Sequence, residues 1–218
     1  MQKYVNIIKD REDAAEKLLD VIPMNKFKEE KWNIVAVSRG GFLLGTYINK
    51  RYKNNLEILF LEAINAPHNS ECEVARVSET EEIVIHEELV DSFGIQYDYI
   101  YGEAHRKHEE NILSHVYQFR KGRPFPSMEK EVVLLVDEGC ETGSKMMTAL
   151  KTVLAQNPKA VYIAVPVLPS DVLEQLETFV DDIFFLQDIE DYVETSLYYE
   201  KLETLDDEKI EKLIEENR

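Results

Sequence analysis

The 218-residue chain has little cysteine, no long apolar run and few positive charges. Its two cysteines, Cys72 and Cys140, have no CxxC spacing, so we expect free thiols in a reducing compartment. No stretch approaches the roughly 18 uninterrupted apolar residues of a membrane span, and no cationic N-terminal segment leads into an apolar run. These absences together predict a cytoplasmic protein.

Positive charge is scarce because 25 Lys and Arg stand against 43 Asp and Glu, which gives a formal net charge of −18. Binding to nucleic acid or to an anionic membrane needs a basic surface, so we expect neither partner. An anionic small molecule would need local cations, or a divalent cation bound with it, to reverse the field. The apolar share of 44% is enough for one sizeable core, and we expect residues 1–218 to form a single domain.

Short apolar runs alternate with helical patterns along most of the chain. The predicted strands are 33–37, 56–61, 83–85, 132–136, 161–165 and 182–186. The predicted helices are 11–22, 42–48, 103–119, 142–154, 170–179 and 206–218, the last with a solvated, charged surface. This alternation predicts an α/β fold, with a mostly parallel sheet flanked by helices and ligands bound beyond the carboxyl ends of its strands. Residues 65–101 are acid-rich and irregular apart from 83–85, so we expect an insertion or flexible loop there.

One turn between a strand and a helix carries most of the recognisable chemistry. The strand at 132–136 runs into two acids, Asp137 and Glu138, and then into a loop that contains two glycines and two hydroxyl side chains. Backbone N–H groups at a helix start, together with the hydroxyls of Thr142 and Ser144, suit a phosphate dianion, and carboxylates accept hydrogen bonds from vicinal sugar hydroxyls. The alternative is that the acids only end a strand and Thr142 only caps a helix.

This turn resembles the phosphoribosyl-pyrophosphate (PRPP) signature of type I phosphoribosyltransferases. Over nearly the whole chain, further blocks resemble the bacterial family of predicted phosphoribosyltransferases. These blocks are Asp10-Arg11-Glu12-Asp13-Ala14, Ser38-Arg39-Gly40-Gly41, Ala66-Pro67 with Asn69 and Glu71, Arg120 to Pro124, Val165-Pro166-Val167, and Tyr192-Val193 with Tyr198-Tyr199. The resemblance implies a Rossmann-like type I phosphoribosyltransferase fold, with a small hood and a helix in residues 187–218.

The resemblance also implies transfer of ribose 5-phosphate from PRPP to a ring nitrogen of a base, with release of pyrophosphate and with Mg²⁺ bridging pyrophosphate and sugar. Carried over by position, Asp137 and Glu138 would hold the ribose hydroxyls. The pyrophosphate would be bound by Ser38, Arg39, Gly40 and Gly41. The 5′-phosphate would be bound by Gly139, Cys140, Thr142, Gly143, Ser144 and Lys145.

Further residues have expected roles near the base. Glu141 stands where hypoxanthine-guanine enzymes have an aspartate that acts as proton acceptor, although a solvated loop acid is the alternative. Tyr192, Val193 and Tyr198 are expected to bind the base. The tyrosines at 192, 198 and 199 would form a hood that stacks on it, or would pack against the sheet instead.

The departures from the family concentrate where charge matters. Ser38 replaces a proline, Glu138 replaces the second aspartate and Lys145 replaces a threonine. The family's basic pair becomes Glu62 and Ala63. Because loss of these cations would weaken stabilisation of the leaving pyrophosphate, phosphate binding is better supported than turnover.

Three functional classes stay open, namely a phosphoribosyltransferase, a non-catalytic PRPP or nucleotide sensor, and a different α/β enzyme. The third class lacks support because neither a Walker lysine motif nor a GxGxxG after the first strand is present. His105, His108 and Glu109 share a helical spacing that fits a metal, but their charged surroundings are typical of an exposed helix, and we expect no protein-held metal. Cys140 has an alternative role as an acidified thiol at a helix start. A homodimer is a further expectation.

Overall fold

A computed structural model describes residues 6–217 and contains a central parallel sheet. Its five strands are β1 (Asn33–Ala36), β2 (Leu56–Ile58), β6 (Val132–Val136), β7 (Ala160–Pro169) and β8 (Asp182–Ile189). They lie in the order β2-β1-β6-β7-β8, and every neighbouring pair is parallel. The predicted α/β fold, with a mostly parallel sheet flanked by helices, is confirmed.

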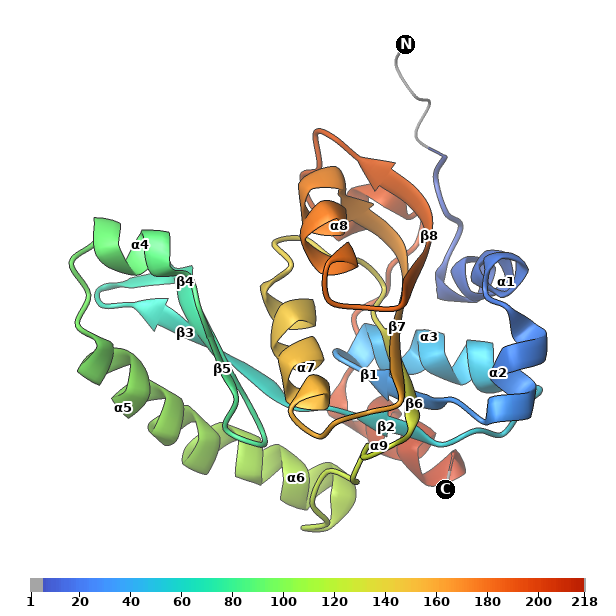
Figure 1. The fold of residues 1–218 in the computed structure, drawn as a ribbon, viewed down its shortest axis with the longest axis horizontal. Helices are drawn as coiled ribbons and strands as arrows, with labels where there is room; N and C mark the ends of the chain where they lie inside the picture. Colours follow the sequence, from blue (N-terminus) through green and yellow to red (C-terminus); the bar gives the residue numbers. More distant parts are fainter. Residues whose placement is uncertain (1–5, 218) are drawn as a thin grey trace.

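Helices cover both faces of this sheet (Figure 1). One face carries α1 (Arg11–Val21), α2 (Met24–Glu30) and α3 (Arg39–Asn49), and the other carries α7 (Ser144–Leu154) and α8 (Ser170–Glu177). Leu134 and Val136 of β6 pack in the core with the first group, whereas Val133 and Leu135 pack with the second. Since β6 is buried on both faces, its carboxyl end is one of the best-fixed points in the molecule.

A second, antiparallel sheet forms an arm (residues 61–120) that extends from the body (Figure 1). The arm consists of β3 (Leu61–Ala66), β4 (Asn69–Ser78), β5 (Ile83–Ile85), α4 (Glu87–Ser92), α5 (Tyr97–Lys107), the π-helical turn η1 (His108–Ile112) and α6 (Leu113–Arg120). The prediction of an irregular segment at 65–101 is therefore wrong, whereas the strand predicted at 83–85 is present as β5. Register shifts between Ile64 and Ala66 interrupt the two-residue period, which explains why the sequence pattern does not reveal the hairpin.

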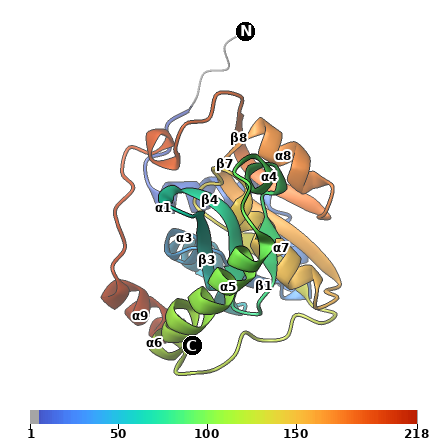
Figure 2. The ribbon, with the colours of Figure 1, turned by 90° about the vertical axis from the view of Figure 1, so that its left-hand side faces the viewer.

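The C-terminal segment (residues 190–206) leaves β8, passes the carboxyl ends of the strands and reaches α9 (Asp207–Glu216). Figure 2 shows it running along one side of the molecule, with α9 close to α6. A short 3-10 helix, η2 (Thr195–Tyr198), lies within it, and the backbone of Tyr199 forms an isolated bridge with Ile8. The prediction of a solvated C-terminal helix is only partly right, because Ile210 and Ile214 are buried; Arg218 lies outside the described residues.

No helix within residues 6–217 is long and apolar enough to cross a membrane.

Candidate active site

Two loops meet at the carboxyl ends of β1 and β6, although about a hundred residues separate them along the chain. The N–H of Val37 donates to the carbonyl of Val136 at 3.1 Å, and the hydroxyl of Ser38 donates to Asp137. A Cβ on Gly41 would lie 2.5 Å from the Val136 carbonyl oxygen, so the close approach requires glycine there. The loop expected at the pyrophosphate and the loop expected at the ribose therefore lie side by side.

Ser38 joins the two loops through one oxygen atom. Its Oγ accepts a hydrogen bond from the N–H of Gly41 at 2.9 Å, as the N-cap of α3, while the same hydroxyl donates to Asp137. The Arg39 side chain forms an ion pair with Asp207 of α9, and Gly40 lies against the carboxylate of Glu138. Among the residues expected to bind pyrophosphate, Gly41 thus has an N–H group that already donates to Ser38 within the loop.

Asp137 is held in place by three neighbours. It is 3% exposed, its Oδ1 accepts hydrogen bonds from Ser38 and from the N–H of Glu138 at 2.8 Å, and its Oδ2 lies 3.6 Å from Nζ of Lys145. The negative charge of Asp137 raises the pKa of Lys145. The arrangement fixes a carboxylate and an ammonium side by side at the mouth of the sheet.

Glu138 pairs with Arg11, a residue that the sequence does not predict to be part of the site. Nε of Arg11 donates to its carboxylate, and Nη1 of Arg11 donates to the carbonyl of Glu203 at 2.9 Å. The hydroxyl of Tyr199 donates to the carbonyl of Glu138 at 2.7 Å. Burial raises the pKa of the Glu138 carboxyl, and Arg11 opposes that rise. Arg11 and Tyr199 thus tie the first helix and the C-terminal segment to the second acid.

The loop after Glu138 has the shape of a strand-to-helix turn that ends at a left-handed glycine. Gly143, with φ of +74°, is the N-cap of α7, and the N–H of Ser144 donates to Oγ1 of Thr142 at 3.4 Å. The N–H of Cys140 donates to the carbonyl of Val167 at 3.1 Å. The N–H groups of Glu141 and Thr142 have no hydrogen-bond acceptor within residues 6–217. Convergence of these groups on a phosphate stays a prediction.

Cys140 is a packing residue. Its side chain is buried among the residues of β6, α7 and α8, and burial raises its pKa to about 12. The alternative of an acidified thiol is wrong, because desolvation outweighs the effect of the nearby helix start.

The arm supplies site residues that the sequence analysis missed. The hydroxyl of Ser144 donates to the Glu73 carboxylate, which in turn accepts from Nε and Nη2 of Arg76 at 3.0 and 2.5 Å. Glu73 and Arg76 belong to β4, and in the hairpin register Arg76 lies opposite Ala63. No signal in one sequence identifies them, because the strand that carries them has the pattern of a loop. Glu62 is instead held by Asn111 and Lys107.

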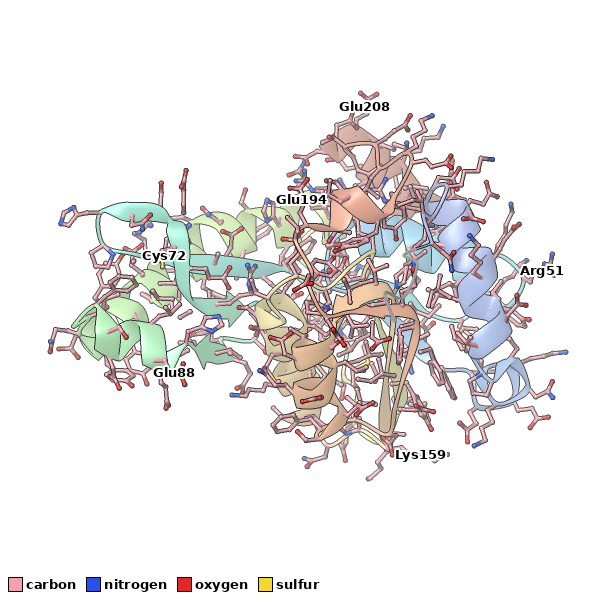
Figure 3. All side chains as sticks on the ribbon, turned by 90° about the horizontal axis from the view of Figure 1, so that it is seen from above. Arg51, Cys72, Glu88, Lys159, Glu194 and Glu208 are labelled. Carbon is pink, nitrogen blue, oxygen red and sulfur yellow. The ribbon has the colours of Figure 1, made fainter. Side chains whose placement is uncertain are left out.

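A cleft of about 740 Å³ lies between the arm, the β6–α7 loop and the C-terminal segment. In Figure 3, Cys72 marks the arm and Glu194 marks the C-terminal segment. The lining residues are Glu71, Cys72, Glu73, Arg76, His86 and Leu89 from the arm, residues 137–143, 145 and 146 from the loop and α7, and Glu194, Thr195, Ser196 and Leu202 from the C-terminal segment. Arg76 and Lys145 are the two cations among these lining residues, which also include six acids, namely Glu71, Glu73, Asp137, Glu138, Glu141 and Glu194.

Glu141 reaches across to the C-terminal segment. Its Oε1 accepts hydrogen bonds from both the N–H and the hydroxyl of Thr195, each at 3.1 Å. A Cβ on Gly139 would lie 2.4 Å from Cγ2 of the same threonine, so the loop and the segment are in close contact. The Glu141 side chain faces the C-terminal segment, and its hydrogen-bond partners are the N–H and the hydroxyl of Thr195.

The tyrosines of the C-terminal segment pack on one another. The rings of Tyr192 and Tyr198 lie 4.8 Å apart, and the hydroxyl of Tyr198 accepts the N–H of Val193 at 3.3 Å. Burial raises the pKa of Tyr192. Val193 is exposed, and among the described residues it is Glu194, Thr195 and Ser196 of this stretch that line the cleft. Base stacking by the tyrosines stays a prediction.

Comparison with known proteins finds similarity, at low identity, to proteins named as phosphoribosyl transferases. No family profile matches the chain. A Mycobacterium tuberculosis protein provisionally named a phosphoribosyl transferase, from strain H37Rv, is 22% identical over 183 residues, which are 84% of this chain and 40% of that protein; the protein from strain CDC 1551 gives the same values. The chain thus spans about 40% of the length of the curated relatives it matches.

Among solved structures, the protein TT1426 from Thermus thermophilus superposes with a TM-score of 0.79 and 25% identity, over 96% of this chain and 98% of that one. A purine phosphoribosyltransferase from Pyrococcus horikoshii is 13% identical and matches 88% of this chain and 99% of that one, with a TM-score of 0.42. The resemblance to phosphoribosyltransferases inferred from the sequence blocks is confirmed, at low identity.

Proposed function

We propose that this chain binds PRPP and transfers its ribose 5-phosphate to a nitrogenous base, with release of pyrophosphate. The single observation that carries the proposal is the contact of the Ser38–Gly41 loop with Asp137 and Glu138 at the carboxyl ends of two adjacent parallel strands. Ligands of such sheets bind at this edge, and one extended ligand could touch both loops. Two cations of the neighbouring cleft, Arg76 and Lys145, could face a phosphorylated ligand, and a divalent cation bound with that ligand would offset the six acids that line the same cleft.

In the proposed reaction the bond between the ribose anomeric carbon and the base nitrogen forms while the bond to pyrophosphate oxygen breaks. The transition state resembles an oxocarbenium ion, so the protein contributes mainly by positioning and by charge. Asp137 and Glu138 would accept hydrogen bonds from the ribose hydroxyls, and the loop from Gly139 to Lys145 would bind the 5′-phosphate. Glu141 would accept the proton that the base loses.

The residues present fit a Mg²⁺ ion that arrives with its substrate. Asp137 and Glu138 offer hard oxygen ligands of the kind Mg²⁺ prefers, while no group of three or more metal-ligating side chains gathers within residues 6–217. When bound with PRPP, Mg²⁺ would neutralise part of the charge on the leaving pyrophosphate.

A second candidate is a non-catalytic protein that binds PRPP or a nucleotide and reports on it. The observation that favours it is the engagement of the site's own acids, because Arg11 pairs with Glu138 and Thr195 donates twice to Glu141. In addition, Glu62 and Ala63 stand where the resembling family has two cations. Such a site could hold a phosphate without stabilising a leaving group.

Pyrophosphate release with a panel of purine and pyrimidine bases, in the presence of PRPP and Mg²⁺, tests the proposal. Release that depends on one class of base supports the transferase. PRPP binding without release for any base replaces the transferase with the sensor. We further propose a cytoplasmic location and a homodimer, and light scattering after gel filtration measures the latter.

A further inference from the structure

Glu73 occupies a position in the cleft that resembles that of a bound anion. Its carboxylate accepts two hydrogen bonds from the Arg76 guanidinium, at 3.0 and 2.5 Å, and a third from the hydroxyl of Ser144 at the first turn of α7. A bidentate guanidinium, a hydroxyl and a helix start form a set of donors that commonly holds phosphate. The Arg76 side chain is 14% exposed, so part of its hydration is already removed.

We propose that Arg76 binds the 5′-phosphate of the ligand, and that Glu73 occupies this place until the phosphate displaces it. The inference rests on the proposed function, since it assumes a sugar 5′-phosphate at the loop before α7. Ser144 is the link, because it belongs to that loop and already donates to the carboxylate that holds Arg76. Glu73 then swings away with its charge, and the phosphate accepts the hydrogen bonds of Arg76 and Ser144 in its place.

The hairpin register explains how the cation reaches this cleft. Directly opposite residues of an antiparallel pair project from the same face of the sheet, and Arg76 lies opposite Ala63. Arg76 therefore projects from the face of the hairpin that carries position 63, and its side chain lines the cleft together with the loop before α7. Arg76 is also near enough to Lys145 to lower its pKa, against the larger effect of Asp137, so both cations act on one region of the cleft.

The experiment measures the affinity of ribose 5-phosphate and of pyrophosphate by calorimetry. Ribose 5-phosphate carries the 5′-phosphate without the pyrophosphate, so it reports on the proposed contact alone. We expect Arg76→Gln to weaken ribose 5-phosphate binding by about 10- to 100-fold, the usual effect of losing charged hydrogen bonds. Pyrophosphate affinity should change much less. Glu73→Gln should strengthen ribose 5-phosphate binding by about two- to fivefold, because the competing carboxylate is gone.

The matched control is Arg106→Gln on the same arm. Arg106 makes a bidentate ion pair with Glu103 three residues earlier, as Arg76 does with Glu73, but on the exposed surface of α5. It should leave both affinities unchanged, and circular dichroism verifies the fold of each variant.

If the wild-type protein binds ribose 5-phosphate and the Arg76→Gln variant binds it with equal affinity, the assignment of Arg76 is overturned while the proposed function stands. Weaker binding in Glu73→Gln overturns the displacement by phosphate. Wild-type protein that binds neither PRPP nor ribose 5-phosphate overturns the proposed function itself, and this inference with it.

Discussion

At the residue scale, Asp137 and Glu138 of the candidate site each have protein partners. Ser38 and Lys145 hold Asp137, and Arg11 holds Glu138. A phosphorylated ligand therefore meets two acids that are already paired, in a cleft whose six lining acids outnumber its two cations. Binding must exchange one set of partners for another, which makes single-residue substitutions informative.

The two cysteines should differ in reactivity. Burial raises the pKa of Cys140 to about 12, whereas Cys72 is half-buried on the wall of the cleft. Since the thiolate is the reactive form, we expect iodoacetamide to label Cys72 and to spare Cys140 in the folded protein at about pH 8. Peptide mass spectrometry measures the labelling, and both should react in urea. Labelling of folded Cys140 as fast as Cys72 would show that the loop opens.

The Glu141→Gln variant tests whether Glu141 accepts a proton from the base or only holds the C-terminal segment in place. If Glu141 accepts the proton of the base, the substitution should lower turnover by a factor on the order of a hundred while PRPP still binds. Initial rates of pyrophosphate release, with PRPP affinity measured in parallel, provide the test.

Thr195→Val is the matched control, because it removes the hydroxyl that donates to Glu141 but leaves the carboxylate in place. We expect it to change turnover much less than Glu141→Gln. Equal losses in the two variants would mean that Glu141 only fixes the C-terminal segment.

At the scale of elements, the arm is the part of the fold whose strands the sequence pattern does not predict, apart from β5. Val74, Ala75 and Val77 of β4 are buried, but the exposed first half of the strand and the register shifts opposite it hide the alternation. The predicted helix 103–119 begins six residues too late, since Tyr97 and Tyr101 are exposed aromatics that interrupt the polar surface. Arg76 and Glu73 are missed together with the strand that carries them.

A buried ion pair fixes the base of the arm. Arg120 at the end of α6 pairs with Glu79, which follows β4, and their side chains are 1% and 3% exposed. The guanidinium also lies 5.2 and 5.9 Å from the ring centres of Phe60 and Phe125. Burial raises the pKa of Glu79, and Arg120 opposes the rise.

We expect Arg120→Met to lower the free energy of unfolding by about 3–5 kcal/mol near neutral pH, because it leaves a buried carboxylate without a counter-ion. In this variant the folded-state pKa of Glu79 lies above the unfolded value of about 4.3. The contribution of Glu79 is then most favourable below the unfolded pKa and is lost as the pH rises through the folded-state pKa. Urea unfolding at about pH 5.5 and about pH 8 should therefore show the larger deficit at the higher pH.

Arg106→Met is the control for this measurement, because the ion pairs of Arg106 are exposed. Its effect should stay within about 0.5 kcal/mol at both pH values. An Arg120→Met variant as stable as the wild type at the higher pH would contradict the account of the pair.

For the whole molecule, the sequence predicted the layers and the loops but not the surroundings of the site. Contiguous patterns, such as the apolar run of β6 and the glycines after it, are sufficient to predict the parallel sheet and the turn from Asp137 to Ser144. Arg11 and Thr195 reach the same place from opposite ends of the chain, and the sequence alone does not determine such distant contacts. The segments that were predicted correctly are those whose pattern is local.

The central claim is that the turn before α7 binds the 5′-phosphate of PRPP, and titration calorimetry with PRPP and Mg²⁺ tests it most directly. The comparison is between wild type, Thr142→Val and the control Thr178→Val. The Thr178 hydroxyl donates to the carbonyl of Gln175 at the exposed end of α8, away from the cleft. We predict about one PRPP per chain, with affinity weakened roughly tenfold or more in Thr142→Val by the lost phosphate contact and unchanged in the control. Absence of PRPP binding, or equal affinity in wild type and Thr142→Val, would contradict the account.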